Sequence, residues 1–413
     1  MLHKVSYSVI IRFLSLAVNM LTFILTAQYF GPEGRGYIAA VNTVVATFAT
    51  LAGFSIGRVL VFEIQKSQLS ASSFYRKNIF TLLCICAILS ILVWISAFIL
   101  YWGYPQLFGE TPAIYYLLFF ITAPTLIWQG YSSFIFASLD KLEKQNRILL
   151  FGLILYVIVA YAAVLFFKVP FFVFLLLMVV YNLSVGITEI VSVLKLTGMF
   201  RVFQLNTFKC LWESGLKLHT DTVGGLLITS SNMLIITSSM PIAEVGIFQF
   251  ASQLINMMVI LPTMVSLQFN ADITSLGANK SFEKHRIYIW GVTGVMIAGC
   301  ALAWLLAPLI ITLLGGGEFE SAIPVFRILL ISVIGNSFSI LISSQYSGRG
   351  YFKLVSMLTI ILGLIGLGAS YLGILNYGLW GAAYATNAVY TISMLINIGF
   401  YIFLAKKVKE SYK

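Results

Sequence analysis

Charged side chains are scarce in this sequence. Asp, Glu, Lys and Arg make up 9% of the 413 residues, whereas hydrophobic residues make up 60%. The longest polar segment, residues 195–219, is too short to bury a hydrophobic core of its own. This composition excludes a soluble domain of useful size and indicates a protein that lies almost entirely in a membrane.

Cysteine and histidine are also rare. The four cysteines give no disulfide framework, since two of them share one expected helix and Cys210 is expected to face a reducing cytoplasm. The three histidines (His3, His219 and His285) are too scattered for a metal site. No phosphate-binding loop or nucleophile constellation is found in the sequence. We therefore expect a protein that is not an enzyme and carries no cofactor.

Long apolar stretches fill the rest of the chain. Each is close to the ~20 residues that a helix needs to cross the hydrocarbon core of a bilayer. Backbone polar groups must be satisfied within lipid, so these stretches are expected to be helices. The twelve stretches cover residues 6–30, 36–62, 79–100, 113–138, 148–167, 171–194, 220–240, 245–269, 287–314, 322–346, 354–375 and 378–404. The sequence thus predicts an all-α, polytopic membrane protein with 12 transmembrane helices.

Lys and Arg concentrate in every second link between these stretches. Most of the 25 basic residues lie in one set of links, and the other set contains only Arg35 and Lys168. The positive-inside rule then places both termini and the basic links in the cytoplasm, and a bacterial inner membrane is the expected location. Because the charges are spread over short links, the net charge of +11 gives no support to nucleic-acid binding.

The second half of the sequence repeats the first after a shift of about 210 residues. Gly36 and Gly246 begin corresponding stretches, and Pro32 and Pro241 precede them. The expected organisation is an N-terminal six-helix bundle (1–198), a cytoplasmic linker (199–219) and a C-terminal six-helix bundle (220–413), related by pseudo-symmetry. Transporters built from such repeats place the substrate path between the halves.

Several short motifs resemble a known family. They are residues 28–37 (QYFGPEGRGY), residues 53–58 (GFSIGR), and the turns Phe108-Gly109-Glu110 and Gly317-Glu318-Phe319. These motifs resemble the Wzx-like O-antigen and polysaccharide flippases of the multidrug/oligosaccharidyl-lipid/polysaccharide (MOP) exporter superfamily.

The resemblance implies a fold, a substrate and partners. The fold would be two six-helix bundles around a central cavity that works by alternating access. The substrate would be an undecaprenyl-pyrophosphate-linked oligosaccharide repeat unit of O-antigen, the polymer of lipopolysaccharide, or of a similar surface polysaccharide. A polysaccharide polymerase and a chain-length regulator are the implied protein partners, together with the lipid bilayer.

The first stretch carries a polar row along its whole length. At about 100° per residue its members fall within a sector of about 80°. An Arg that faces lipid costs several kcal/mol, so we expect this row to line a cavity. Helix packing through small polar residues and snorkelling of Arg12 to the headgroups are the alternatives. The row consists of Ser8, Arg12, Ser15, Asn19, Thr22 and Thr26.

The second stretch carries a matching row, namely Thr43, Thr47, Thr50 and Arg58. The two stretches run in opposite directions, which places Arg12 and Arg58 at a similar depth of about 9 Å below the cytoplasmic interface. A guanidinium suits phosphate oxygens because it donates in a bidentate manner. We therefore hypothesise that both bind the pyrophosphate of the substrate. The alternative for both is that they are snorkelling anchors at the headgroups or pair with Glu63 or Glu189.

The second half offers neutral polar rows. Amides and hydroxyls suit the hydroxyl groups of a glycan, and helix packing is the alternative role. The rows comprise Thr222, Thr229 and Asn232 beside Gly225, then Gln249, Ser252, Gln253, Asn256 and Thr263, and finally Asn336, Ser339 and Ser343. Of these, Thr229, Asn232, Gln249, Gln253 and Asn256 are the expected glycan contacts.

Uphill transport would need a coupling site. Among Glu63, Glu189 and Asp221, Glu189 lies deepest in its stretch, and it is the candidate for H⁺ or Na⁺ coupling or for pairing with an Arg. Two other functions stay open. A cation-coupled drug exporter of the MATE type would need acidic cavity residues, and an enzyme of polysaccharide assembly would need a large periplasmic loop or catalytic carboxylates.

Overall fold

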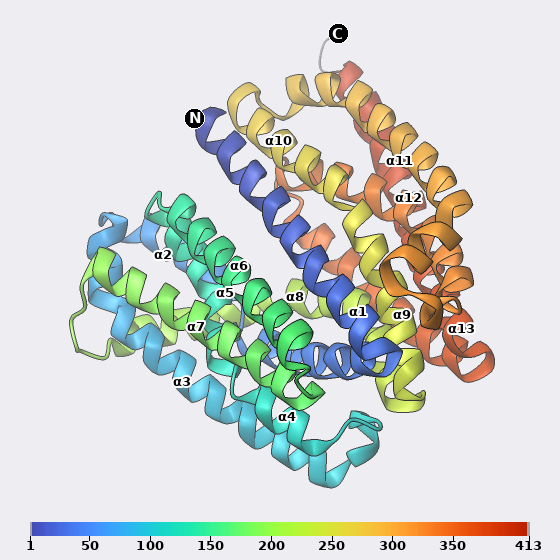
Figure 1. Cartoon of the computed structure of the whole chain (residues 1–413). Coiled ribbons are helices and arrows are strands. Elements are labelled where there is room, and N and C mark those ends of the chain that lie inside the picture. Colours follow the sequence, from blue (N-terminus) through green and yellow to red (C-terminus); the bar gives the residue numbers. More distant parts are fainter. Residues whose placement is uncertain (1, 411–413) are drawn as a thin grey trace. The chain divides into compact units, whose positions relative to one another are not determined.

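A computed structural model describes the backbone of residues 2–410. It describes their side chains as well, except those of residues 2–10, 12, 13, 217, 218, 271, 274, 275 and 347. Throughout this range the chain forms helices and turns with no strand, which confirms the predicted all-α class (Figure 1).

The helices follow one another with short connections. In chain order they are α1 (Leu2–Ala52), α2 (Ile56–Ser67), α3 (Ala71–Gly103), η1 (Pro105–Phe108), α4 (Ala113–Phe120), α5 (Ala123–Ser138), α6 (Leu142–Phe167), α7 (Phe171–Thr197), α8 (Leu205–Ser239), α9 (Ile242–Met258), α10 (Ile260–Leu276), α11 (Ala278–Gly315), η2 (Gly317–Phe319), α12 (Ala322–Ser347) and α13 (Phe352–Glu410).

Eight helical segments of the described chain are long and apolar enough to cross a membrane, or nine if α4 and α5, which meet at 42°, form one bent span. The two longest, α1 and α13, each contain a glycine with non-helical angles. Gly31 has φ 61° and ψ −165°, and Gly378 has φ 55° and ψ −135°. Only glycine adopts such angles readily, so each of these helices is broken in two at that position. The protein is therefore a multi-pass membrane protein.

The chain forms two compact units. Unit 1 consists of Met1–Phe30, Tyr37–Val223 and Thr237–Ile242, and unit 2 consists of Gly31–Gly36, Gly224–Ile236 and Ala243–Lys413. The division therefore falls inside α8, between Val223 and Gly224. The segment predicted as a linker, 199–219, is helical from Leu205 on, because α8 begins there.

Each unit has one helix at its centre. In unit 1, α5 packs against α2, α3, α6 and α7, and its Trp128, Tyr131 and Phe136 are almost completely buried. In unit 2, α12 packs against α10, α11 and α13, which lie beside it in Figure 1. Phe338 and Leu341 of α12 are fully buried in a cluster with Phe269 and Phe282.

Close packing of α12 on α13 depends on Gly335. A Cβ atom added at this position would collide with the backbone carbonyl of Tyr390, which cannot move without displacing α13. By contrast, a Cβ atom added at Gly294 of α11 would meet no atom within 4 Å.

We predict that Gly335→Ala destabilises the protein by about 1–3 kcal/mol, since the extra methyl group overpacks the α12–α13 contact. Thermal unfolding of the purified protein in detergent would measure the loss. Gly294→Ala is the matched control and should leave the melting temperature unchanged or raise it slightly, because Ala favours helix more than Gly does. Equal melting temperatures for the two variants would contradict this account of the packing.

Candidate functional site

The second predicted transmembrane stretch is broken in the structure. α1 ends at Ala52, α2 begins at Ile56, and the turn between them places Phe54 (φ 44°) and Ser55 (φ 52°) in the left-handed region. Side chains other than glycine occupy this region at a cost of roughly 1–2 kcal/mol per residue. The predicted polar row is therefore wrong as a continuous feature, because the turn separates Thr50 from Arg58.

One face of α8 packs on this turn. The ring of Phe54 lies 4.6 Å from that of Trp212 and 5.3 Å from that of His219. A Cβ atom added at Gly215 would lie 2.6 Å from the carbonyl oxygen of Phe54, so only glycine allows this approach. Ser55 Oγ is hydrogen-bonded to Thr222 Oγ1 at 2.7 Å. Positions 212, 215, 219 and 222 have the three- and four-residue spacing of one helix face, so this face of α8 holds the turn in place.

Arg58 lies on the first turn of α2, directly beyond this break. Its Nη1 donates to Oδ2 of Asp221 at 2.7 Å, and the two side chains are 48% and 28% exposed. The alternative pairing with Glu63 or Glu189 is therefore wrong. The ion pair uses one of the five guanidinium N–H donors, which leaves donors for a second acceptor.

A cavity of about 260 Å³ lies beside Arg58 within unit 1. Among the described residues that line it, Arg58 is the one charged side chain, and Thr50, Ser55 and Thr222 supply hydroxyl groups. The remaining lining comes from α1, the turn, α2 and α5, and it is mainly apolar with several glycines and alanines. The structure thus brings Arg58 and Thr222 of the sequence analysis together at one cavity.

The predicted row on the first half of α1 is placed only in part. The side chains of Ser8 and Arg12 lie outside the described residues, so the predicted match of Arg12 with Arg58 stays a prediction. Ser15 is half-buried and Asn19 is exposed. Thr26 donates to the carbonyl oxygens of Thr22 and Phe23. The hydroxyls of Thr22 and Thr47 are buried and have no hydrogen-bond partner among the described residues.

Glu189 of α7 is fully buried in unit 1. Its Oε2 accepts a hydrogen bond from Ser132 Oγ of α5 at 2.8 Å, and its Oε1 accepts one from Gln145 Nε2 of α6 at 2.9 Å. Both partners are neutral, and no basic side chain in the described part of the chain pairs with this carboxyl group. A buried carboxyl group in a transmembrane helix is costly, and one held by neutral donors can take up a cation or a proton.

Two of the predicted glycan contacts are already engaged within unit 2. Arg35 is buried and donates from Nη2 to Oε1 of Gln249. The side-chain amide of Asn232 donates to Thr386 Oγ1 at 2.6 Å and to the carbonyl oxygen of Ala382 at 3.3 Å.

The other three predicted glycan contacts differ in exposure. Thr229 is exposed and donates to the carbonyl oxygen of Gly225. Gln253 is half-buried, and Asn256 is exposed.

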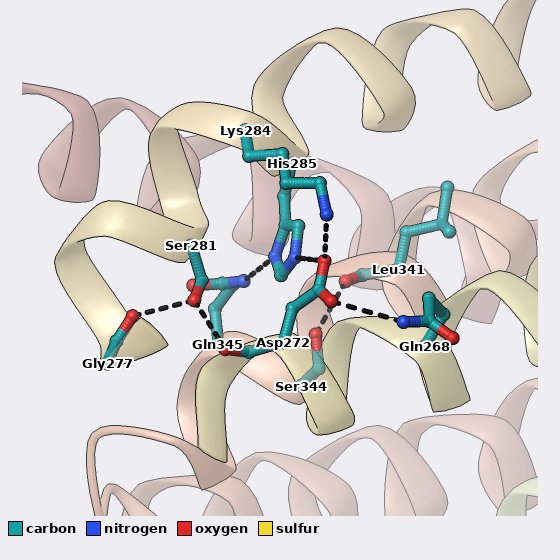
Figure 2. A network of polar contacts seen from close by, with 9 residues as sticks. All are labelled: Gln268, Asp272, Gly277, Ser281, Lys284, His285, Leu341, Ser344 and Gln345. Carbon is teal, nitrogen blue, oxygen red and sulfur yellow. Dashed lines mark hydrogen bonds and ion pairs between the residues drawn. The ribbon is translucent and has the colours of Figure 1, made fainter. Parts of the chain in front are cut away.

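A polar network that the sequence analysis missed lies in unit 2, where the ends of α10, α11 and α12 meet (Figure 2). Asp272 of α10 accepts hydrogen bonds from Lys284 Nζ at 2.8 Å and from Gln268 Nε2 at 3.1 Å. His285 of α11, which is fully buried, places Nε2 3.3 Å from Oδ2 of Asp272. The ring of Phe269 stacks on this imidazole with the centroids 3.8 Å apart.

The network is directional. Arg349 donates from Nη1 to Oε1 of Gln345 at 2.6 Å, which fixes the orientation of that amide. The Gln345 amide nitrogen, 2.9 Å from His285 Nδ1, must then be the donor, so Nδ1 is the acceptor and Nε2 carries the proton toward Asp272. A chain of donors therefore runs from Arg349 through Gln345 and His285 to the carboxylate of Asp272.

Few features of the sequence indicate this network. Lys284 and Arg349 look like ordinary basic residues of two links, and His285 is one of three histidines scattered over the sequence. The one signal in the sequence is Asp272, an acid close to the end of a predicted apolar stretch. Within the described residues no three His, Cys, Asp or Glu side chains are grouped so as to hold a metal ion.

Comparison with known proteins assigns the family. The polysaccharide biosynthesis protein family matches residues 1–264, which is more than half of the chain. This chain belongs to the polysaccharide biosynthesis protein family. No curated protein sequence matches the chain.

Several solved structures share the fold of this polysaccharide biosynthesis protein. The lipid II flippase MurJ in an inward closed conformation has a TM-score of 0.76 at 16% identity, and the match covers 97% of this chain and 90% of MurJ. An inward-facing multidrug resistance transporter of the MATE family has a TM-score of 0.74 at 14% identity, covering 95% and 96% of the two chains.

A third structure is a MOP superfamily transporter from Pyrococcus furiosus, described as having a binding pocket of reverse polarity. It has a TM-score of 0.61 at 12% identity, covering 97% and 96% of the two chains. These likenesses show that the protein has the fold of MOP superfamily transporters.

The network in Figure 2 gives a prediction for stability. Burial tends to raise the pKa of Asp272, but the hydrogen bonds from Lys284, Gln268 and His285 outweigh it and hold this pKa below its ordinary value. The folded protein therefore favours the carboxylate. This stabilisation is present above the unfolded pKa of about 3.9 and is lost as the pH falls through the lower folded pKa.

We predict that Asp272→Asn destabilises the protein by about 1.5–3 kcal/mol at pH 7, the range for hydrogen bonds to a charged group. The difference from the wild type should begin to shrink at pH 3, where Asp272 of the unfolded wild type is already largely protonated. Thermal unfolding at both pH values would test this. Glu283→Gln, which removes an exposed pair with Arg286 (3.6 Å), is the control and should have almost no effect. A pH-independent loss in D272N would argue against the carboxylate as the anchor.

Proposed function

We propose that this protein is a flippase that moves an undecaprenyl-pyrophosphate-linked oligosaccharide, the repeat unit of O-antigen or of a similar surface polysaccharide, from the cytoplasmic to the periplasmic leaflet of a bacterial inner membrane. Membership of the polysaccharide biosynthesis family supports a polysaccharide precursor as substrate. The lipid II flippase MurJ has a similar fold. The observation that carries the proposal is a half-exposed guanidinium, that of Arg58, on a cavity with no other charged lining residue in the described chain.

The proposed topology has twelve spans with both termini in the cytoplasm. The breaks at Gly31 and Gly378 divide α1 and α13 into two spans each. α8 is less apolar than the other long helices, and we count it as a further span because 35 helical residues exceed the length a bilayer requires. In this arrangement the two pseudo-symmetric halves work by alternating access, as proposed from the repeat.

Arg58 is suited to a pyrophosphate for two reasons. A guanidinium presents several donors in a planar fork that matches phosphate oxygens, and it keeps its charge in an apolar environment. The hydroxyls of Thr50, Ser55 and Thr222 at the same cavity can donate to the remaining phosphate oxygens. In the absence of substrate, the carboxylate of Asp221 takes the place of the phosphate and keeps the guanidinium paired. Substrate would then share Arg58 with Asp221 or displace it.

A drug exporter is the competing function. A cationic drug needs carboxylates in its pocket, whereas the charged residue at this cavity is a cation. The Pyrococcus furiosus transporter, whose reverse pocket polarity is said to suggest a different function, is a relative by fold. Charge of the lining residues is thus the property that separates the two functions, and here it favours an anionic substrate.

Glu189 is the proposed coupling site for H⁺ or Na⁺. It lies in the same unit as Arg58 and holds only neutral partners, so its carboxyl group can change its charge state without breaking an ion pair. Polymerase and chain-length regulator proteins are the proposed partners downstream, since a translocated repeat unit must next be polymerised.

The main test separates phosphate binding from a purely structural ion pair. We predict that Arg58→Gln weakens binding of undecaprenyl pyrophosphate in detergent micelles about 10- to 100-fold, which corresponds to the ~1.5–3 kcal/mol of a charge-assisted hydrogen bond. Arg58→Lys should bind with intermediate affinity, because the Lys ammonium group keeps the positive charge but lacks the planar set of N–H donors of a guanidinium. Asp221→Asn should bind as tightly as the wild type or more tightly, since the competing carboxylate is gone.

The reversed pair, Arg58→Asp with Asp221→Arg, is the control for a structural role. The double variant restores the ion pair but places a carboxylate at position 58 and the guanidinium at position 221. We therefore expect a folded protein that does not bind the lipid. If the reversed pair recovers binding and Asp221→Asn loses it, Arg58 serves the fold and not the substrate.

A second test concerns coupling. We predict that Glu189→Gln binds the lipid normally but that its rate of lipid translocation in proteoliposomes no longer rises when a pH or Na⁺ gradient is imposed. Glu143→Gln, on an exposed turn of α6 beside Arg147, is the control and should respond to the gradient as the wild type does. If the translocation rate of E189Q still rises with the gradient, the carboxyl group has a structural role and stabilises helix packing through its hydrogen bond with Gln145.

A further inference from the structure

A second cavity, of about 290 Å³, lies within unit 2. α8, α12 and both parts of α13 form it. In the described chain no residue with a charged side chain lines this cavity. Its polar lining consists of amides and hydroxyls, among them Asn336, Ser339 and Ser343 of α12 and Ser393 and Asn397 of α13.

Part of this lining is fixed in advance. Ser339 Oγ lies 2.9 Å from Ser393 Oγ, and the Asn397 amide donates to Ser339 Oγ at 3.1 Å and to the carbonyl oxygen of Ser393 at 2.8 Å. These bonds use the NH₂ group of Asn397 and leave its Oδ1 as an acceptor. A ligand would therefore meet polar groups that are already held in position.

Asn336 is the residue that points to a ligand. It is half-buried, it lines the cavity, and its amide makes no hydrogen bond with any described residue. If these side chains served only to bind helices together, the amide would be expected to bond across the α12–α13 contact, as those of Asn397 and Asn387 do. A half-buried amide without a partner beside a cavity has donors and an acceptor available for a bound molecule.

The rotation of α12 is fixed from its other side. Ser344 and Gln345, which belong to the network of Figure 2, and the buried Leu341 face α10 and α11. Residues 336, 339, 343 and 346 lie on the opposite, cavity-lining face with helical spacing. The network thus holds the cavity-lining face of α12 in one orientation, which is the support that a specific site requires.

We infer that this cavity binds a neutral, hydroxyl-rich molecule, namely a sugar residue of the lipid-linked oligosaccharide. A cation would need a carboxylate and an anion would need a basic group, and the described lining has neither. An apolar molecule would leave the Asn336 amide without hydrogen bonds in a desolvated site. Sugar hydroxyls both donate and accept, which suits the amides and hydroxyls of this lining.

The inference rests on the proposed function and refines the sequence-based assignment of the glycan contacts. Gln249 and Asn232 hold protein partners, whereas Thr229 lines this cavity with the residues of α12 and α13. Recognition of the glycan is thereby assigned to α12 and α13, and recognition of the pyrophosphate to Arg58.

The test compares two lipids. Undecaprenyl pyrophosphate and the lipid-linked oligosaccharide extracted from a strain without the transporter are each titrated into the purified protein. Asn336→Leu, which is close in volume to the wild-type side chain, should bind the glycosylated lipid about tenfold more weakly and the bare lipid normally. Ser343→Ala is a second, smaller change that should shift binding in the same direction. Asn376→Leu, at an exposed position of α13, is the control and should bind both lipids normally.

The outcomes separate this inference from the proposed function. If Asn336→Leu and Ser343→Ala bind the glycosylated lipid as tightly as the wild type, the sugar site is overturned while the flippase proposal stands. If the wild type binds neither lipid, the proposed function fails. In that case, saturation-transfer NMR of the free oligosaccharide with the purified protein tests the sugar site separately. A signal that Asn336→Leu abolishes would support the sugar site, and no signal with the wild type would overturn it.

Discussion

A positive charge inside an apolar helical protein must be paired, and this constraint organises the first unit. Arg58 meets the requirement through Asp221, at 2.7 Å, rather than through a residue of its own helix. Since Asp221 belongs to α8, the pair ties the start of α2 to α8, two residues before the unit boundary between Val223 and Gly224. The same guanidinium lines the cavity in which an anionic group can bind. In the proposed mechanism, pairing with Asp221 and binding of the pyrophosphate would use the same set of donors.

The turn between α1 and α2 follows from the same arrangement. Phe54 and Ser55 adopt left-handed angles that are unfavourable for them in isolation. Ring contacts with Trp212 and His219 and the Ser55–Thr222 hydrogen bond offset this cost. Such a turn gives a membrane helix a change of direction where a cavity needs room. It also makes the conformation at Arg58 depend on α8, so that a substrate that displaces Asp221 would loosen both.

The sequence was sufficient for the features that depend on composition and period. The all-α class, the membrane location and the family resemblance follow from apolar stretches and from short motifs such as residues 28–37. Arg58 could be selected because a basic residue within an apolar stretch is expensive. Its partner could not be predicted, because Asp221 lies 163 residues further on, at the end of another predicted stretch, and the sequence does not show which stretches pack together.

Other features were hidden for related reasons. The turn at Gly53–Ser55 interrupts the polar row. The helical period of 3.6 residues nevertheless continues through these positions in the sequence, so the pattern does not indicate the break. The network around His285 joins three helices through Gln345, whose neutral side chain gives no signal in charge or hydropathy. The cavity of unit 2 likewise depends on how the helices pack. In the sequence, the row of Asn336, Ser339 and Ser343 has the same pattern whether these side chains hold helices together or contact a ligand.

Each unit contains a cavity of its own. That of unit 1 carries the Arg58 guanidinium, for which a pyrophosphate is proposed, and that of unit 2 is lined by neutral amides and hydroxyls, for which a sugar is proposed. The most direct measurement is a structure of the protein with bound undecaprenyl pyrophosphate. The account predicts phosphate oxygens within hydrogen-bonding distance of the Arg58 guanidinium, with Asp221 shifted away from it. A bound lipid whose phosphates lie elsewhere, with the Arg58–Asp221 pair unchanged, would contradict it.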